Sequence, residues 1–216
     1  MSKGRDLPTH LETRDITGEK LISPSASRNI GPLVKELSSL WSPDAKILEI
    51  ASGTGQHGHG FCEERSDLIW QYSDIDEKAM LSQVAWASEI PEQLLPPIEL
   101  DVLAPNWWRD IKGYQAIFCA NMIHIAPLAT VNGLALGASH ILPNGEPLFL
   151  YGPFLDGENS AQSNLDFDIS LKLRHADWGV RNLANVKHIF ATHGLSLHDR
   201  VQMPRDNYLL VFEKTD

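Results

Sequence analysis

The glycine-rich string GTGQHG at positions 53–58 is the feature that most constrains the fold of this chain. It follows an apolar run over 46–51 and opens a helical pattern over 54–65. The spacing G-x-G-x-x-G is typical of a tight strand-to-helix turn that holds an adenosine-containing ligand. Glycines there allow backbone conformations that other residues avoid and let the ligand approach the main chain. We therefore predict a ligand-binding strand–loop–helix unit.

The same alternation of strand and helix patterns continues along the chain. Strands are expected at 46–51, 68–73, 97–102, 115–121 and 147–152, with helices at 54–65, 77–89 and 128–141 between them. This rhythm predicts right-handed βαβ units and a parallel sheet. After a helix at 182–193, the apolar runs 195–203 and 207–214 are too close for a crossover helix and should be antiparallel. We predict an α/β fold with a mostly parallel seven-stranded sheet and a C-terminal antiparallel hairpin.

The chain length and charge narrow the classes of function. The 216 residues suit a polar N-terminal extension over 1–24 and a single domain over 25–216 that begins with a helix. The 18 Lys and Arg against 28 Asp and Glu leave a net charge of −10, so we do not expect a nucleic-acid partner. No secretory leader or membrane span is recognised, and Cys62 and Cys119 lie in apolar stretches. A cytoplasmic location without a membrane partner is therefore expected.

Acidic residues that follow the glycine string help to indicate which ligand is bound. Asp74 follows Gly53 by roughly 20 residues, the spacing of a carboxylate that binds ribose hydroxyls in dinucleotide sites. Asp76 is the alternative, although it also suits the N-cap of the next helix. Up to this point a nicotinamide dinucleotide and S-adenosylmethionine fit equally well.

Three features favour S-adenosylmethionine. Glu49 precedes Gly53 by four residues, where dehydrogenases usually have an apolar residue, and the pattern E-x-x-x-G-x-G resembles the first motif of class I S-adenosylmethionine-dependent methyltransferases. The resemblance implies that Glu49 helps hold the loop and faces the methionine end of the cofactor. It also implies that Asp101, at the end of the third strand, accepts a hydrogen bond from the adenine amino group. The terminal hairpin is typical of the same superfamily.

The resemblance extends to one family within that superfamily. The strings SPSASRN, LEIASGTGQH, WQYSD, IFCANMIHIAP, LYGPF and DWGVRN resemble methyltransferase-like proteins of the domain-of-unknown-function 938 family, from residue 23 to about 182. Pro147 departs from the glycine-rich turn usual before the fifth strand. The resemblance implies an S-adenosylmethionine site formed by Arg28, Glu49, Ser52, Gly53, Gly55, Asp74, Ile75, Asp101, Val102 and Asn121.

Candidate catalytic residues follow the fourth and fifth strands. His124 is the candidate general base because imidazole changes protonation near neutral pH, or it anchors the loop by hydrogen bonding. Asn121 could hold the acceptor or the cofactor, or cap the next helix, and Tyr151 and Phe154 are expected beside the acceptor. His57 and His59 are two residues apart on a helix, so they should not share a metal ion, and no metal site is predicted.

The long connection over 153–181 is expected to cover the acceptor pocket. It contains a short helical pattern around 164–173, with Leu165, Ile169 and Leu173 on one face, and Trp178 is expected as an apolar wall. The expected function is methyl transfer to a small-molecule acceptor. The alternatives are a non-catalytic interaction module with this fold and a nicotinamide-dependent oxidoreductase.

Overall fold

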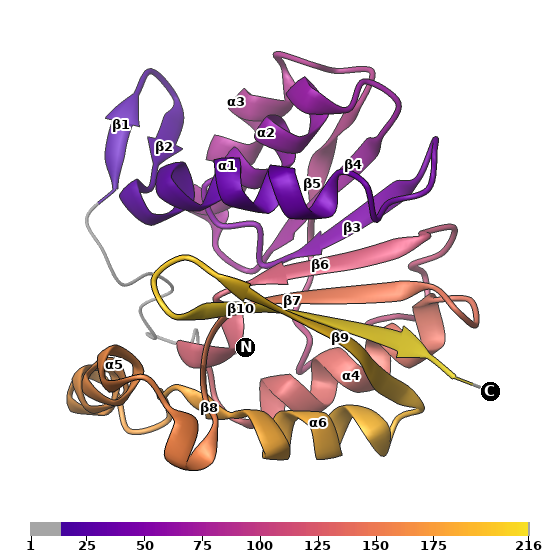
Figure 1. Ribbon diagram of the computed structural model, residues 1–216. Helices are drawn as coiled ribbons and strands as arrows, with labels where there is room; N and C mark the ends of the chain where they lie inside the picture. The colour runs from indigo at the N-terminus through magenta and orange to yellow at the C-terminus, as the bar shows by residue number, and fades with distance from the viewer. Residues whose placement is uncertain (1–13, 216) are drawn as a thin grey trace.

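The computed structural model describes residues 14–215, so residues 1–13 of the expected N-terminal extension lie outside the described part. A central sheet lies between two layers of helices (Figure 1). Its strands are β3 (Lys46–Ile50), β4 (Ile69–Asp74), β5 (Leu94–Glu99), β6 (Ala116–Ala120), β7 (Pro147–Leu155), β8 (Arg181–Asn182), β9 (Leu195–Met203) and β10 (Asn207–Lys214). The helices are α1 (Pro24–Leu37), α2 (Gln56–Glu64), α3 (Glu77–Ala87), α4 (Ala129–Ile141), α5 (Gln162–Arg174) and α6 (Leu183–Ala191), with short 3-10 turns η1 (Met122–His124) and η2 (Gly157–Asn159).

The sheet topology confirms the predicted architecture. The main path has the order β5-β4-β3-β6-β7-β10-β9, and the short β8 adds to it by pairing with the end of β7. β5, β4, β3, β6 and β7 are parallel, whereas β10 runs antiparallel to both β7 and β9. The β9–β10 turn places Arg205 and Asp206 in the left-handed region, as a tight hairpin requires. The order of the strands reverses between β3 and β6, which is where open α/β sheets bind ligands.

One predicted strand is shifted along the chain. The third parallel strand runs over Leu94–Glu99, not over 97–102. It contains Pro96 and Pro97, which lack the amide donor that a central strand needs, and it tolerates them because β5 is an edge strand. Asp101 and Val102 therefore lie in the turn after the strand and do not end it.

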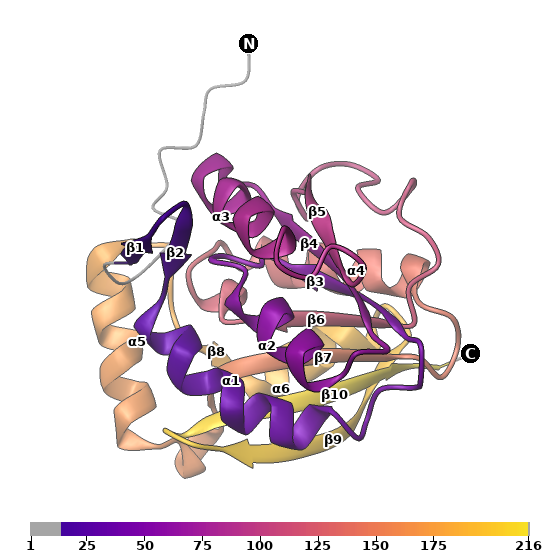
Figure 2. The same ribbon diagram turned by 90° about the horizontal axis from the view of Figure 1, so that it is seen from above.

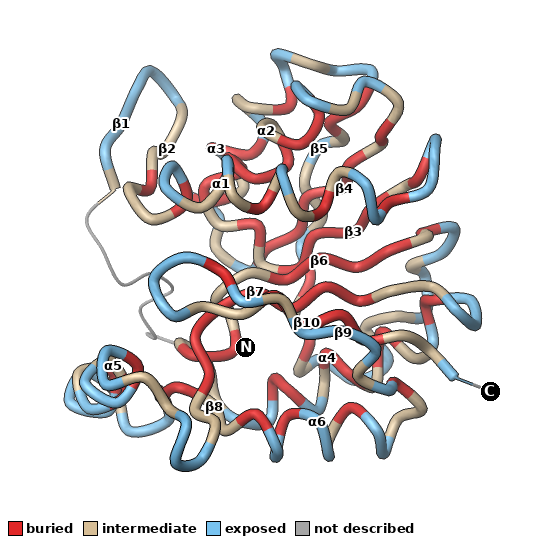
Figure 3. The backbone as a smooth tube through the Cα atoms, viewed as in Figure 1, coloured by how far each residue is buried: buried red, intermediate tan, exposed pale blue. Residues whose placement is uncertain are grey.

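Alternating side chains of the central strands build two cores. Along β3, Ile47 packs toward α1 and α2, while Leu48 packs toward α4 and α6. β7 repeats the pattern, since Tyr151 joins the first core and Leu150 the second. Figure 3 shows these central strands as the most continuously buried part of the chain. Both faces of the parallel strands are thus covered, which is the rule for parallel sheets.

An N-terminal hairpin packs beside the glycine loop. It consists of β1 (Asp15–Thr17) and β2 (Lys20–Ile22). The amide of Leu21 donates to the Ser82 hydroxyl at 2.8 Å, and that hydroxyl donates to the carbonyl of Thr54 at 2.7 Å. The Lys20 ammonium lies 4.1 Å from the centre of the Trp86 ring on α3. Residues 14–22 are therefore attached to α3 and, through Ser82, to the loop.

Helix α5 lies at the end of the molecule where the parallel strands end (Figures 1 and 2). Its apolar face does not pack against the domain: Leu165, Ile169 and Leu173 are 38%, 59% and 84% exposed. The buried face instead carries Asp168, Leu171 and Asn164, whose amide donates to the carbonyls of Phe154 and Asp206. The apolar periodicity located the helix, but polar anchoring set its rotation.

Candidate cofactor and acceptor site

The loop after β3 has the conformation that its glycines predict. Gly53 and Gly55 have φ angles of 58° and 88°, in the left-handed region that glycine adopts without strain. A side chain at Gly55 would also approach Trp86, since a Cβ there would lie 3.0 Å from the indole ring. The amide of Ser52 donates to the carbonyl of Ser73 at 2.8 Å, so the loop leaves the sheet beside the end of β4.

The Asp74 carboxylate accepts hydrogen bonds from three backbone amides, one of which lies in the glycine loop. One carboxylate oxygen accepts from the Gly53 amide at 2.8 Å, and the other accepts from the amides of Ile75 and Asp76 at 2.8 and 3.0 Å. Burial raises the pKa of Asp74 against the opposing effect of these backbone donors. Asp76 accepts from the Ala79 amide at 3.0 Å as the N-cap of α3. Asp74 thus sets the geometry of the glycine loop, and Asp76 has the capping role that its position suggested.

The turn after β5 places Asp101 and Val102 at the carboxyl ends of the parallel strands, as Asp74 is at the end of β4. The Asp101 carboxylate accepts from the Leu103 amide at 2.8 Å. Val102 is buried against α4, where a Cβ on Gly133 would lie 2.2 Å from the Val102 carbonyl oxygen. Ile75, after β4, keeps half of its side chain exposed. Asp74, Ile75, Asp101 and Val102 therefore follow neighbouring strands at one edge.

Glu49 is buried beneath the loop, with 1% of the residue exposed. Its carboxylate accepts from the Trp70 indole at 2.9 Å and lies 3.3 Å from Nδ1 of His57. Its backbone carbonyl accepts from the hydroxyls of Ser52 and Ser73 at 3.3 and 2.6 Å. Glu49 thus links β3 to β4 and to the first turn of α2.

Gln56 docks the first turn of α1 onto the glycine loop. Its side-chain oxygen accepts from the Ser23 amide at 2.6 Å and from the Thr54 hydroxyl at 2.9 Å, while its nitrogen donates to the Ser27 hydroxyl at 2.9 Å. Arg28 is exposed on the same helix. Sequence reasoning missed Gln56, although its position inside the glycine string could have marked it.

Arg14 is a second residue that sequence reasoning missed. Its guanidinium lies 3.7 Å from the position that a Cβ on Gly53 would occupy. It precedes β1, in a segment that the pattern indicated only as a polar extension. No local signal links it to the loop, because the contact depends on how the hairpin packs against α3.

Asn121 and His124, which follow β6, converge on Gly152 within β7. A Cβ on Gly152 would lie 2.5 Å from Nε2 of His124 and 3.1 Å from Oδ1 of Asn121. Asn121 has a φ angle of 59°, and its side chain does not cap the following turn. The structure therefore brings these two candidate residues together, and the absence of a side chain at Gly152 makes room for them.

His124 is fully buried, with its ring edge against Phe154 at a centroid distance of 5.6 Å. Neither ring nitrogen has a hydrogen-bond partner among the described residues. Burial, and then the positive charge of Arg181, lower the pKa of His124 to about 3. The imidazole is neutral at physiological pH, and one of its nitrogens is an unpaired acceptor.

Tyr151 does not join this group. It pairs with Ala120 in the register of β6 and β7, and its side chain packs in the α1–α2 core on the other face of the sheet from Phe154. Its hydroxyl accepts from the Asn207 amide at 3.0 Å, and burial raises its pKa to about 12. The alternation of side chains along β7 separates Tyr151 from His124.

The segment over 153–181 is attached to the His124 turn. The Gly179 amide donates to the His124 carbonyl at 3.0 Å, and the Arg181 guanidinium donates to the carbonyls of Ile123 and Ala126. Trp178 is 2% exposed and packs with Leu171 and Val180 in a small separate core. The segment therefore holds the backbone of η1 in place, and Trp178 stabilises the segment itself.

The low pKa of His124 predicts a pH-dependent loss of stability. The unfolded chain binds the imidazole proton with a pKa near 6.5, whereas the native protein binds it near 3. Between these values the unfolded state binds more protons, so the free energy of unfolding falls as the pH decreases. From about pH 7.5 to about pH 5.5 we expect the wild type to lose about 1 kcal/mol more than His124→Gln. Urea denaturation at both pH values measures the difference, and equal losses would contradict the buried neutral state.

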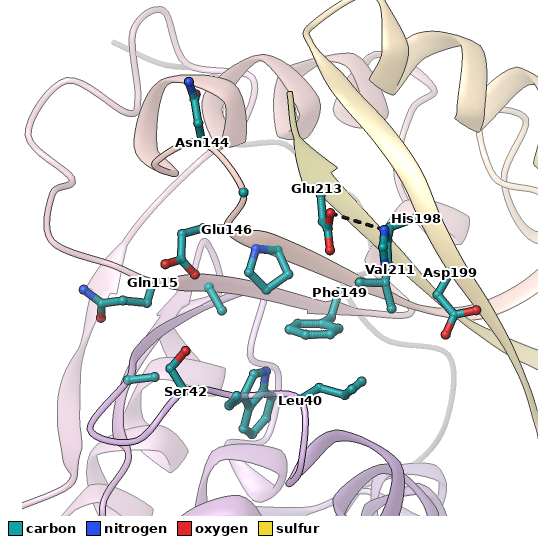
Figure 4. Close-up of a pocket in the computed structure, with 15 residues that line it drawn as sticks. Leu40, Ser42, Gln115, Asn144, Glu146, Phe149, His198, Asp199, Val211 and Glu213 are labelled. Atoms are coloured by element: carbon teal, nitrogen blue, oxygen red, sulfur yellow. Dashed lines mark ion pairs between the residues drawn. The ribbon is translucent and has the colours of Figure 1, made fainter. Parts of the chain in front are cut away.

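A cavity of about 430 Å³ lies at the opposite, amino-terminal edge of the sheet (Figure 4). Phe149 and Val211 are among its apolar lining residues, and Glu146 contributes a carboxylate. His198 and Glu213 point toward one another there, with 3.3 Å between Nδ1 and the carboxylate. The cavity and the glycine loop lie at opposite ends of the parallel strands, so the cavity is not part of the site described above.

The described residues show neither a metal-binding cluster nor a membrane-spanning helix. Within residues 14–215, no three His, Cys, Asp or Glu side chains gather in a way that could hold a metal ion. Among the same residues, no helix has the length and apolar character needed to cross a bilayer. Cys62 and Cys119 are both buried free thiols.

The family model described as "Protein of unknown function (DUF938)" matches residues 20–214. The chain belongs to the DUF938 family. This confirms the family resemblance of the sequence motifs, and the match includes the glycine loop, the His124 turn and the terminal hairpin.

Solved structures that include methyltransferases share the fold of this DUF938 chain. The pyocyanin biosynthetic protein PhzM superposes with a TM-score of 0.70 at 11% identity, over 89% of this chain and 59% of PhzM. CalO1, a methyltransferase of calicheamicin biosynthesis in its S-adenosylhomocysteine-bound form, gives 0.69 at 12% identity, over 88% and 54%. Human N-acetylserotonin methyltransferase in complex with S-adenosylmethionine gives 0.68 at 10% identity, over 85% and 52%. The chain spans between half and two thirds of these neighbours, and the likeness confirms the Rossmann-like methyltransferase fold.

Proposed function

We propose that this protein binds S-adenosylmethionine and transfers its methyl group to a small-molecule acceptor. The observation that carries the proposal is that Asn121 and His124 both lie against Gly152, and that the buried His124 has no hydrogen-bond partner among the described residues. This group lies near the point between β3 and β6 where the strand order reverses, as does the glycine loop after β3. The residues of the loop fit this cofactor. Gly53 and Gly55 have left-handed backbone conformations and no side chains, so a ligand can approach the main chain, and Glu49 occupies the position of the acidic residue in the first methyltransferase motif.

The cofactor would be held by residues from four neighbouring strands. Asp74 would accept from the ribose hydroxyls, Asp101 from the adenine amino group, and Ile75 and Val102 would contact the adenine ring. Ser52, Gly53 and Gly55 would bring backbone groups to the middle of the ligand, with Asn121 and the first turn of α1, including Arg28, on the methionine side. When bound, S-adenosylmethionine supplies a methyl group that its sulfonium has already activated.

The protein's own task is to align the acceptor and exclude water. Positioning of this kind can supply roughly 7–11 kcal/mol of barrier reduction. An acceptor hydroxyl would donate a hydrogen bond to the lone pair of the neutral His124, which would orient its oxygen toward the methyl carbon. His124 would take the hydroxyl proton only if the bound state raised its pKa above about 3, while the methyl carbon moved from sulfur to oxygen and the sulfur kept the bonding electron pair. The segment over 153–181 would cover the acceptor, since its residues hold the His124 turn.

The ligands and biosynthetic roles of the structural neighbours support a small acceptor. The O-methyltransferase family 2 protein from Planctomyces limnophilus, solved in complex with apigenin, has a TM-score of 0.69 at 14% identity, over 93% of this chain and 62% of that protein. PhzM and CalO1 belong to the biosynthesis of pyocyanin and calicheamicin. The net charge of −10 also disfavours an acceptor on a nucleic acid.

Titration calorimetry with S-adenosylmethionine, S-adenosylhomocysteine and NAD tests the cofactor. Binding of the first two ligands in the micromolar range, with no heat from NAD, is the expected result. Binding of NAD alone would favour an oxidoreductase and leave Glu49 and Asp101 without a ligand role. Silence toward all three ligands from a folded protein would favour an interaction module that keeps the fold without catalysis.

A screen of small hydroxyl-bearing acceptors, read out as S-adenosylhomocysteine formation, tests the transfer step. On an acceptor that must lose a proton, His124→Gln should lower turnover while leaving S-adenosylhomocysteine affinity unchanged. Full turnover by this variant would remove His124 from the proposed chemistry.

A further inference from the structure

His57 combines three observations that its position in the sequence does not explain. It is the second residue of α2, directly after the glycine loop, and it is only 8% exposed. Its Nδ1 lies 3.3 Å from the Glu49 carboxylate. Its Nε2 is buried without a hydrogen-bond partner among the described residues. A buried ring nitrogen without a partner costs free energy unless a ligand or a water molecule satisfies it.

Glu49 determines what His57 can bind. A carboxylate only accepts hydrogen bonds, so the proton of the neutral imidazole lies on Nδ1 and Nε2 has a lone pair. The second oxygen of Glu49 accepts from the Trp70 indole at 2.9 Å, a neutral donor. With the imidazole neutral and the carboxylate ionised, the group carries one buried negative charge and one buried acceptor without a partner among the described residues, directly after the loop. This combination is complementary to a cationic N–H donor.

We infer that His57, oriented by Glu49, is a binding residue for the α-ammonium group at the amino-acid end of the cofactor. The inference rests on the proposed function and assigns a role that the glycine pattern alone does not contain. Among the groups of S-adenosylmethionine, the ammonium is the one that is both cationic and a hydrogen-bond donor. Glu49 would act on it through His57, which makes Glu49 a positioning residue.

Three ligands distinguish the group that is recognised. S-adenosylhomocysteine carries both the ammonium and the carboxylate, its decarboxylated analogue keeps only the ammonium, and 5′-methylthioadenosine lacks both. In the full chain, His57→Asn keeps an amide donor near the position of Nδ1 and removes Nε2. We expect this variant to bind the first two ligands about 10-fold more weakly or worse and 5′-methylthioadenosine with unchanged affinity.

Two variants serve as matched controls. His57→Gln places its amide near the position of Nε2 and should recover part of the lost affinity. His59→Asn alters the other histidine of the helix, which pairs with Glu63 and Glu89 and packs against Trp86, and it should leave all three affinities unchanged. Thermal unfolding of each variant confirms that the chain folds.

The remaining outcomes would overturn the assignment. Equal weakening of all three ligands by His57→Asn would mean that the residue only supports the loop. Weakening of S-adenosylhomocysteine alone would move the contact to the carboxylate, and unchanged affinities would remove His57 from the site. Failure of the wild type to bind any of the three ligands would overturn the proposed function itself, which separates that failure from the others.

Discussion

Replacing Gly152 by alanine is expected to lower the free energy of unfolding by about 1–3 kcal/mol and to displace the His124 ring. The new methyl group would lie 2.5 Å from Nε2 of His124 and 3.1 Å from Oδ1 of Asn121. The imidazole is fully buried against Phe154, so it cannot move aside without disturbing the core. On a proton-bearing acceptor, turnover should fall by about 100-fold, because small displacements of an aligned group are costly in rate.

Gly31→Ala is the control for this experiment. Gly31 lies within α1, and no atom lies within 4 Å of the position of an added Cβ. Alanine is favoured over glycine in a helix, so this variant should gain up to about 1 kcal/mol. Urea denaturation measures both effects, and the His124 ring resonances report the displacement. A Gly152→Ala protein as stable as the wild type, with unshifted ring resonances, would contradict the close packing at this position.

Asp74→Ala is expected to weaken S-adenosylhomocysteine binding by about 10-fold to 100-fold and to cost about 1–3 kcal/mol of stability. The change removes the acceptor for the amides of Gly53, Ile75 and Asp76, which would leave three partly buried donors without their partner. It would also release the glycine loop from the end of β4. Both effects act on affinity, because the loop and the ribose depend on the same carboxylate in the proposed complex.

Asp76→Ala provides the comparison. Its carboxylate caps α3 through the Ala79 amide, so its loss should cost roughly 0.5–2 kcal/mol of stability with little effect on affinity. Calorimetry with S-adenosylhomocysteine and urea denaturation of both variants separate the two roles. If affinity survived in Asp74→Ala and fell in Asp76→Ala, the ribose contact would belong to Asp76.

Much of the fold could be predicted because its signals are local. Apolar runs located the strands of the main sheet path except β5, and the short connection before Asn207 required antiparallel pairing. The shifted β5 was missed because its two prolines resemble a loop, and only its place at the sheet edge makes them acceptable. The rotation of α5 was missed for a related reason. Asn164 and Asp168 are buried and hydrogen-bonded to residues outside the helix, whereas Leu165, Ile169 and Leu173 are left outside.

In the candidate site, too, local sequence patterns predicted some features and long-range contacts decided the others. The sequence pattern pointed to the glycine loop, to the acids within β3, at the end of β4 and after β5, and to the polar residues after β6. Its grouping of Tyr151 with His124 does not hold in the structure, and strict alternation along β7 could have separated Tyr151 from Phe154 in advance. Gln56 and Arg14 acquire their contacts from α1 and from the N-terminal hairpin, which no spacing in the sequence relates to the loop.

The sequence by itself therefore determined the order of the elements and the backbone conformation of the loop, because periodicity and glycine content act over a few residues. Tertiary structure alone decided the chemical state of the side chains. His124 is neutral because the fold buries it next to Arg181, and His57 has one unpaired nitrogen because Glu49 lies beside the other. Burial and charge proximity depend on distances between residues far apart in the chain, and local patterns carry no record of those distances.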